Sequence, residues 1–555
     1  MTSVNSAAPT MALAADSEKS ALARLLERHA LAALLLIVIL GFCLRMRGLD
    51  RAGFNEDEVQ KINAARAYLH GDFSRNLEHP MLLKSMIAVS LAAADRWNRG
   101  LGRSHPVSDE MAVRFPNVVL GALTAIVIFG LAREWFGLDV ALLSALLWSA
   151  GTIAIMDNRL AKEDTLLVLF AWLGYYFYIR AKKASAIQVR QHAEPYAKWY
   201  AAAGASFGLM LASKYFPHYL ALIFLYYFLP LNRKEYPPLC RRDFVLLLGT
   251  CALVFLVANP VILAPGTVRY MLHYVGEGTM THHGYLMMGH FYFNDVAHLR
   301  GGMPFYFYLL MLAIKTQLPV LVALGVGMVE VVRRRKEAGA SFLILMFLFW
   351  IIPFSLVSSK WLRWMLSWMP AVYIIAAIGL VKIFSWARDL RVESRSRLLV
   401  PAWNALIFLV FLVRPLWTAA KAGPFYPLYL NPLGLGRAGY YFPQDVSANA
   451  ECFRSSAETR RIYPACCFIC SNLMEQGHAN PRAVLGAIVA GSATAVSFLL
   501  WLLYGHQASA QFAGHWTFLP ALNAFLNGLS AIALCGGAVL HQASESASPE
   551  GRWIQ

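Results

Sequence analysis

The chain has 555 residues, of which 58% are hydrophobic and only 15% are charged, and its mean hydropathy is +0.49. A soluble protein normally carries about a quarter charged residues, so this composition excludes an ordinary soluble enzyme. The formal net charge of +17 does not indicate a nucleic-acid-binding protein. Its lysines and arginines cluster in short loops between apolar segments, as they do in the cytoplasmic loops of membrane proteins.

Apolar segments long enough to cross a membrane recur along the whole chain, and they predict an all-α polytopic membrane protein. We expect about eleven transmembrane helices up to residue 418 and about two more near the C-terminus. The first segment lacks a small-residue cleavage site, so we expect a retained span and not a removed signal peptide. The eleven helices are expected at 29–46, 112–131, 138–156, 164–180, 198–213, 216–231, 243–259, 304–331, 341–357, 364–386 and 398–418.

The apolar segment 80–95 is short and rich in alanine, serine and methionine, so we interpret it as an interfacial helix that does not cross the membrane. With a cytoplasmic N-terminus, every dense basic cluster of the later loops then falls on the cytoplasmic side, as the positive-inside rule requires. If the segment crossed, the same clusters would face outward. These clusters comprise Arg133; Arg180, Lys182, Lys183 and Arg190; Arg233, Lys234, Arg241 and Arg242; Arg333, Arg334, Arg335 and Lys336; and Arg388, Arg391, Arg395 and Arg397.

This topology predicts a domain organisation in which the polar segments gather on the extracytoplasmic face. Short outer turns at 214–215 and 358–363 join them. The predicted parts are a cytoplasmic tail at 1–28, a transmembrane core at 29–418 that includes a helical first outer loop at 47–111, an extracytoplasmic segment at 419–480, and a C-terminal two-helix membrane segment of unknown role at 481–555. The turn near 157–164 and the loop at 260–303 also face outward.

Three acids follow the first span directly: Glu56, Asp57 and Glu58. The simple interpretation is a solvated start of a loop. Beside a membrane surface, however, a tight group of acids is more typical of a catalytic base or a cation site. Further along the same loop, His79 and Lys84 stand at the head of the interfacial helix. Lys84 either extends its ammonium group to the interface or binds a lipid phosphate there.

Other outer segments add further candidates. The turn from Arg159 to Asp164 is densely charged for an apolar region, and Lys214 lies between two spans. Neighbouring His282 and His283 could ligate a metal, although sequence neighbours point in different directions in regular structure. A local group of cysteines, Cys466, Cys467 and Cys470, contains one CxxC pair, for which a disulfide or free thiols are favoured over a metal site.

The pair Asp57-Glu58, the segment His79-Pro80 with Lys84, and the turn from Arg159 to Asp164 together resemble the protein O-mannosyltransferase family. They also resemble its bacterial relatives, the aminoarabinose transferases that modify lipid A. The segments 426–429 and 439–443 are similar to bacterial members of this group as well. The resemblance extends over roughly residues 30–450, and its motifs are weak singly but fairly specific in their order and common face.

The resemblance implies the GT-C fold and transfer of a sugar from a polyprenyl-phosphate donor to an acceptor hydroxyl. It assigns the catalytic acid to Asp57, with Glu58 as its neighbour. Cations near the donor phosphate or lipid would be Lys84, Arg114, Lys214, Lys360 and Arg363. Asp164 would match the acid of the turn before the fourth span. Apart from the resemblance, we expect Glu56, His79, Arg159, His282 and His283 to support the site. The transfer requires no cofactor, and a divalent metal near the acids stays an open alternative.

The chemistry expected from these residues fits such a reaction. A sugar phosphate already carries a good leaving group, so the reaction mainly needs a base for the acceptor hydroxyl, which a carboxylate can provide. Lysine and arginine can stabilise the charge that develops on the phosphate. A lipid-linked donor also explains a site at the membrane surface. The partners expected are therefore the lipid-linked donor, membrane lipids, and a protein, lipid or glycan acceptor, and the location is a bacterial plasma membrane with an extracytoplasmic site.

Some features depart from the family pattern. Glu56 adds an acid before the usual pair, which leaves the base open to a shift by one position. The segment after Pro80 lacks a second proline, and the sequence diverges after Pro443. Two other classes of function also fit a polytopic chain: a secondary transporter, and a non-catalytic assembly or flippase-like protein. Transporters usually place ionisable residues in the middle of helices, whereas the acids here gather at helix ends.

Overall fold

The computed structural model describes residues 21–100, 102, 104–191, 196–228, 239–276, 281–295, 302–393 and 405–441. The chain divides into two units, Met1–Pro481 and Arg482–Gln555, and all of the described residues belong to the first. The predicted C-terminal membrane segment and the cysteine group at 466–470 lie outside the described residues, as does the part of the extracytoplasmic segment beyond residue 441.

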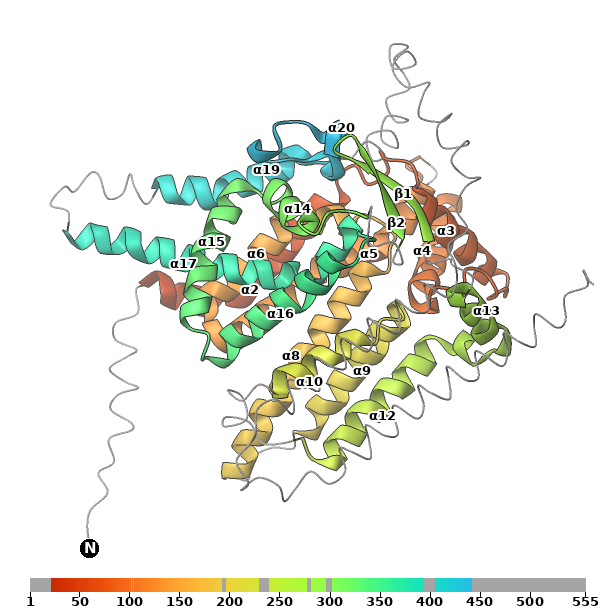
Figure 1. Cartoon of the computed structure of the whole chain (residues 1–555), viewed down its shortest axis with the longest axis horizontal. Coiled ribbons are helices and arrows are strands. Elements are labelled where there is room, and N and C mark those ends of the chain that lie inside the picture. The colour runs from red at the N-terminus through yellow and green to blue at the C-terminus, as the bar shows by residue number, and fades with distance from the viewer. Residues whose placement is uncertain are drawn as a thin grey trace, which may run out of the picture. The chain divides into compact units, whose positions relative to one another are not determined.

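Long helices form most of the described chain, because long apolar segments satisfy their backbone hydrogen bonds internally only in this way within a membrane. Figure 1 shows α8, α9 and α12 packed side by side, and α15 against α17. The principal helices are α2 (Ala21–Met46), α5 (Asp109–Phe136), α6 (Leu138–Ala150), α7 (Thr152–Asn158), α8 (Asp164–Gln191), α9 (Ala197–Ser213), α10 (His218–Phe228), α12 (Arg241–Ala258), α14 (Phe307–Lys315), α15 (Leu318–Arg333), α16 (Ala338–Leu356), α17 (Met369–Glu393) and α19 (Arg414–Ala422).

Five of the described helices are long and apolar enough to cross a membrane, or six if a bent pair of helices counts as one span. The chain is therefore an integral membrane protein, and the predicted fold class, a predominantly helical membrane bundle, is confirmed. The predicted number of about eleven spans stays a prediction. The five are Glu27–Met46, Asp109–Phe136, Ala338–Leu356, Met369–Trp386 and Ala405–Ala422.

Two predicted helices are interrupted. The helix expected at 138–156 bends by 57° between α6 and α7, and the one expected at 304–331 breaks between α14 and α15. Hydrogen bonds connect the two breaks. The Thr152 hydroxyl donates to the Lys315 carbonyl (2.9 Å), and the Gln317 side-chain amide donates to the Ala150 carbonyl (2.8 Å). The uninterrupted helices predicted there were wrong, because apolar composition alone does not show where side chains replace helical hydrogen bonds.

The segment interpreted as an interfacial helix forms α4 (Met81–Arg99), which packs against α3 (Glu56–Leu69) and α5. Its buried face carries Leu83, Ile87 and Leu91, at the spacing of one helical stripe. Among the helices of the described chain, α4 is not one of those long and apolar enough to span. The helices α3 and α4 thus form a helical pair within the first loop and position its charged residues.

A two-stranded antiparallel hairpin is an addition to the predicted fold. Strand β1 (Thr281–Met287) pairs with β2 (His290–Asp295) through a turn at Met288 and Gly289, both of which have positive φ. The Met288 amide donates to the Tyr440 carbonyl (2.8 Å), so the hairpin contacts α20 (Ala438–Tyr441). The same loop also contains helix α13 (Pro265–Gly276).

Candidate functional site

The first turn of α3 presents the three acids found in the sequence. Asn55 caps the helix: its side chain accepts from the Glu58 amide (2.9 Å), while the Glu58 carboxylate accepts from the Asn55 amide (3.2 Å). This reciprocal capping box fixes the start of the helix immediately beside Asp57. The side chain of Glu56 lies outside the described residues. The local sequence thereby sets the direction in which Asp57 leaves the helix.

Glu58 and Arg114 form a buried pair behind this turn. The Glu58 side chain is fully buried and contacts the Arg114 guanidinium through both oxygens, at 2.9 and 2.7 Å. It also accepts from the Ala161 amide (2.9 Å), so it joins α3 and α5 to the turn that precedes α8. Arg114 donates its remaining N–H groups to carbonyls of residues 49, 52 and 53. All of these groups are satisfied within the protein, which is the arrangement of a structural anchor.

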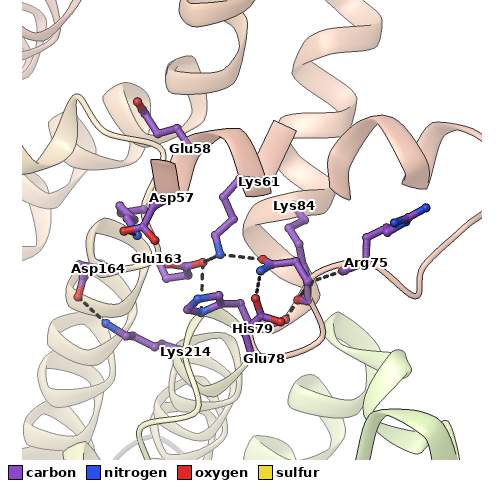
Figure 2. A network of polar contacts seen from close by, with 12 residues as sticks. Asp57, Glu58, Lys61, Arg75, Glu78, His79, Lys84, Glu163, Asp164 and Lys214 are labelled. Atoms are coloured by element: carbon purple, nitrogen blue, oxygen red, sulfur yellow. Dashed lines mark hydrogen bonds and ion pairs between the residues drawn. The ribbon is translucent and has the colours of Figure 1, made fainter. Parts of the chain in front are cut away.

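Asp57 is placed differently. Its side chain is 48% exposed, and one carboxylate oxygen contacts the Lys162 ammonium and lies 3.5 Å from the Arg363 guanidinium. Lys162 itself is only 6% exposed and Arg363 25%. The half-exposed carboxylate therefore lies between solvent and two basic side chains, the buried Lys162 and the partly exposed Arg363. Figure 2 shows Asp57 beside Glu163 and Asp164. A base there can be reached by a ligand.

Asp164, in the first turn of α8, extends the same group. One of its oxygens contacts the Lys214 ammonium at 2.8 Å, and the other lies 3.7 Å from Arg363 Nε. Lys214 ends α9, and Arg363 belongs to the short helix η2 (Leu362–Ser367). Arg363 therefore lies between the two carboxylates, Asp57 and Asp164. We call Asp57, Lys162, Asp164, Lys214 and Arg363 the Asp57 cluster.

Burial first, and then the nearby Arg363 charge, lower the pKa of Lys162 to about 7 against the opposing effect of Glu163 and Asp164. An ordinary lysine has a pKa of about 10.4 and would be charged throughout the physiological range. Lys162 instead exchanges its proton near neutral pH. The charge that faces Asp57 thus depends on pH within that range.

A second network lies next to the Asp57 cluster (Figure 2), and it joins buried Glu163 and Lys61 to the partly exposed His79. Glu163 pairs with Lys61 at 2.6 Å and lies 3.5 Å from His79 Nδ1. Burial by itself would raise the pKa of Glu163, but the charges of His79, Lys61 and Lys162 outweigh it and hold that pKa well below its usual value. Burial lowers the pKa of His79 to about 4, so its imidazole is neutral at neutral pH.

Two of the predicted phosphate-binding lysines have carbonyl partners in this structure. Lys84 is 1% exposed, and its ammonium donates to the carbonyls of Arg75 (3.3 Å), Asn76 (2.5 Å) and His79 (2.8 Å). Burial, followed by the Lys61 charge, lowers its pKa to about 7. Lys360 is likewise buried and donates to the Met303 and Val357 carbonyls. A phosphate contact by either lysine stays a prediction.

The structure therefore brings together Asp57, Asp164, Lys214 and Arg363, which the sequence placed on one face. Arg159 lies at the same turn, where its guanidinium donates to carbonyls of residues 45, 47 and 48. The residues His282 and His283 lie on β1, and their side chains lie outside the described residues. The catalytic and binding roles predicted for all of these residues stay predictions.

Sequence reasoning missed Lys61, Lys162 and Glu163. A signal for Lys61 was available, because residue i+4 on a helix lies on the same face as residue i, and Lys61 stands four residues after Asp57. Lys162 and Glu163 lie inside the turn that was selected for its charge, but no regular period applies to a turn. Their directions became visible only in three dimensions.

A metal ion does not fit the described side chains well. Among them, no group of three or more His, Cys, Asp or Glu residues could hold one. The carboxylates of Asp57 and Asp164 each contact basic side chains, which would repel a divalent cation. We therefore assign no step of the reaction to a metal.

Residues 106–263 match the family model described as dolichyl-phosphate-mannose-protein mannosyltransferase. The matched range contains Arg114, the turn with Lys162 and Asp164, and Lys214, and it begins after Asp57. Over this range, the resemblance to the protein O-mannosyltransferase superfamily predicted from the motifs is confirmed. No curated protein matches the chain in a comparison of sequences.

Three solved structures are similar to the chain. ArnT from Cupriavidus metallidurans bound to undecaprenyl phosphate has 15% identity and a TM-score of 0.47, over 76% of this chain and 77% of that one. The Archaeoglobus fulgidus oligosaccharyltransferase AglB, in complex with an inhibitory peptide and a dolichol-phosphate, has 13% identity and a TM-score of 0.45, over 72% and 56%. The S. cerevisiae protein O-mannosyltransferase complex bound to the sugar donor has 20% identity and a TM-score of 0.34, over 42% and 34%.

Proposed function

We propose that the chain is a membrane glycosyltransferase that transfers a sugar from a polyprenyl-phosphate donor to an acceptor hydroxyl, with Asp57 as the base. One observation carries the proposal: the half-exposed Asp57 carboxylate contacts two basic side chains, the buried Lys162 and the partly exposed Arg363. The match of residues 106–263 to a sugar-transferring family supports the same class of reaction. A base and an anion-binding group are therefore present at one accessible place.

The proposed reaction is a single displacement. The acceptor oxygen forms a bond to the anomeric carbon as the bond from that carbon to the phosphate oxygen breaks, and the hydroxyl proton passes to Asp57. The electron pair of the broken bond leaves with the phosphate, where Arg363 and Lys214 offset the added charge. Attack from the opposite side inverts the anomeric carbon. A covalent glycosyl-enzyme intermediate would contradict this scheme.

The remaining polar residues receive different roles in the proposal. Glu58, predicted as catalytic beside Asp57, is fully buried and paired with Arg114, so we assign both to positioning the first turn of α3. Arg363 and Lys214 are the principal phosphate-binding residues, because their present partners are carboxylates of the same cluster. Lys84 would have to give up its hydrogen bonds to the Asn76 and His79 carbonyls before it could bind the phosphate as well.

The position of the acids also favours an enzyme over a transporter. Asp57 and Asp164 lie in the first turns of α3 and α8, at helix ends, whereas transporters place ionisable groups at the middle of spans. We propose that the site faces outward from a bacterial plasma membrane, where lipid-linked sugars and not nucleotide sugars are available. The proposed sugar is a mannose-like hexose or a modified pentose, and the acceptor a protein, lipid or glycan hydroxyl.

The test is transfer by the purified, reconstituted full chain supplied with radiolabelled polyprenyl-phosphate sugars and membrane extract as the source of acceptor. We expect Asp57→Asn to lower the initial rate by about 10²–10⁴-fold, the usual contribution of a positioned base. The matched control is Asp95→Asn, an exposed acid on α4, which should keep the wild-type rate. Equal rates for Asp57→Asn and wild type would remove Asp57 from its role, and no transfer from any donor would reject the enzyme.

The outward orientation needs its own measurement. In a variant without native cysteines, Asp95→Cys should react with a membrane-impermeant maleimide added to intact cells, because this residue lies in the proposed outer loop and is exposed. Labelling only after the membrane has been opened would place the site on the cytoplasmic side.

A further inference from the structure

Three consecutive charged residues precede and begin α8, and each contacts a different part of the molecule. Lys162 contacts Asp57 on the first turn of α3, and Asp164 contacts Lys214 at the end of α9. Between them, Glu163 points away from the Asp57 cluster and contacts Lys61 and His79 (Figure 2). We call residues 162–164 the charge triplet. Its outer members belong to the Asp57 cluster, and its middle member contacts the buried network instead.

The Glu163–Lys61 contact is a short and dry ion pair. The two groups lie 2.6 Å apart, and each side chain is 2% exposed. Lys61 also donates to the Asn76 side chain at 2.8 Å, which links the pair to the loop before α4. Neither group is accessible to a substrate. Removing one partner of such a pair would leave a buried charge uncompensated.

The position of this pair relates it directly to Asp57. Lys61 lies one helical turn after Asp57 on α3, and Glu163 follows Lys162 in the chain. Two side-chain ion pairs therefore join α3 to the same turn, one at Asp57–Lys162 and the other at Lys61–Glu163. The Asp57–Lys162 contact depends on the distance between α3 and the turn. The buried Lys61–Glu163 pair fixes that distance.

We propose that Lys61 and Glu163 are positioning residues that hold Lys162 against Asp57, an inference that rests on the proposed role of Asp57 as the base. The Glu58–Arg114 anchor fixes the start of α3, but its contact with the turn is made at the Ala161 backbone. Only the Lys61–Glu163 pair, among the described side-chain ion pairs, joins α3 to a neighbour of Lys162 from the buried side. Loss of this pair should displace Lys162 and Asp57 relative to each other without removing either side chain.

The experiment compares Glu163→Gln, Lys61→Met and the double variant in the reconstituted transfer reaction. We expect each single change to lower kcat by about 100-fold, as a displacement of about 1 Å does, with the donor KM within about threefold of wild type. The double variant should recover at least about tenfold of this loss, because it leaves no unpaired buried charge. A residue that acted only through its own chemistry would not be rescued by a second change.

The exposed ion pair Arg66–Asp109 provides the matched control on the same helix. Its side chains are 56% and 45% exposed, so Arg66→Met should leave kcat unchanged. Glu163→Asp keeps the charge but shortens the side chain by one methylene, and it tests the geometry if the neutral variants fold poorly. We expect Glu163→Asp to lower kcat while its unfolding temperature stays near that of wild type.

The outcomes separate the two proposals. If Asp57→Asn is inactive while Glu163→Gln and Glu163→Asp keep the wild-type kcat, the positioning inference is overturned and the proposed function stands. If Asp57→Asn retains wild-type transfer, the proposed function itself fails. If the double variant is as impaired as the single ones and all three lose folded protein in proportion, the pair serves stability alone, which also overturns the inference.

Discussion

Two groups of charged side chains lie around the turn at 157–164, and their hydrogen bonds and ion pairs are made to different kinds of partner. In the first group, Arg45 is fully buried, and its guanidinium donates to the Asn158 side chain (3.0 Å) and to three backbone carbonyls of residues 41, 148 and 149. Arg159 similarly donates to carbonyls near the end of α2. Backbone carbonyls cannot leave without disturbing the helices.

In the second group, the Asp57 cluster, the partners are other side chains. Asp57 is half-exposed, and Arg363 lies at 3.5 and 3.7 Å from two different carboxylates, which is longer than a good charged hydrogen bond. Side-chain partners of this kind can be exchanged for a phosphate or a hydroxyl. A buried charged side chain is therefore not by itself evidence of an active site. The chemical nature of the partners separates an anchor from a reactive group.

The largest effect that would sharpen this comparison is expected from Arg363→Met. We expect kcat to fall by about 10²–10³-fold, because a donor that stabilises transition-state charge is removed, while the unfolding temperature stays near that of wild type. Initial rates and thermal unfolding in detergent measure the two quantities. The control is Arg334→Met, an exposed arginine paired with Glu337 outside the cluster. A matching loss of stability would place Arg363 among the anchors.

The reverse result is expected from Arg45→Met. The change removes the donor that the buried Asn158 side chain and Ser149 carbonyl share, at about 1–3 kcal/mol for a buried unsatisfied group, so we expect a clear fall in the free energy of unfolding. The rate per folded molecule should change little. Thermal unfolding and active-site-normalised rates provide the measurement. An inactive variant that is fully stable would break the distinction between the two groups.

A smaller effect is expected from pH, through Lys162. A lysine is charged below its pKa, and burial lowers this pKa to about 7, so Lys162 loses its charge as pH rises through that value. We expect the transfer rate to fall by less than about tenfold over this interval, because the neutral amine no longer holds the Asp57 carboxylate. Lys162→Met should lack this inflection in its pH–rate profile.

Stability should change in the opposite direction over the same interval. Above pH 7 the folded Lys162 has released a proton that the unfolded chain still binds, up to its ordinary pKa of about 10.4. The free energy of unfolding rises with pH wherever the unfolded state binds more protons than the folded state. Lys162 therefore increases it as pH rises from about 7 to about 10.4. A rate that rises through pH 7 in wild type would reject the assigned role of Lys162.

The smallest effect is expected on removal of divalent metal. Since Asp57 and Asp164 contact basic side chains, we expect treatment with EDTA to leave the transfer rate unchanged. Measurement of initial rates before and after treatment, and after addition of Mg²⁺, Mn²⁺ or Zn²⁺, tests this. If EDTA lowers the transfer rate and one added ion restores it, the carboxylates exchange their basic side-chain partners for a metal.

Much of this arrangement could be predicted from the sequence, because hydropathy and loop charge are averages over many residues. They indicated the membrane bundle, the non-spanning segment at 80–95 and the face shared by Asp57, Asp164, Lys214 and Arg363. The contacts of single residues could not be predicted in this way. The break between α14 and α15 lies at Pro319, which cannot donate to the Lys315 carbonyl, and the Thr152 hydroxyl donates to that carbonyl instead; no hydropathy average contains these features.

The site was predictable to a similar degree. The acids were identifiable from their type and place, but the sequence could not show that Glu58 faces Arg114 while Asp57 faces solvent. Nor could it show that the Lys84 ammonium lies among three carbonyls. These differences depend on side-chain direction within one turn. Side-chain direction is fixed by tertiary contacts and not by local pattern.

The charge triplet has a consequence for how this chain tolerates change in length. Its three members alternate in sign, and each contacts a different oppositely charged side chain. The three contacts therefore require each residue to stand at its own position in the chain. One residue inserted in the turn at 159–161 would set Lys162 against the partners of Glu163, and one residue deleted there would set Glu163 against Asp57. Substitutions elsewhere in the turn change one contact, whereas a shift in length would mismatch all three together. Among homologues, this short turn should therefore keep its length even where its other residues vary.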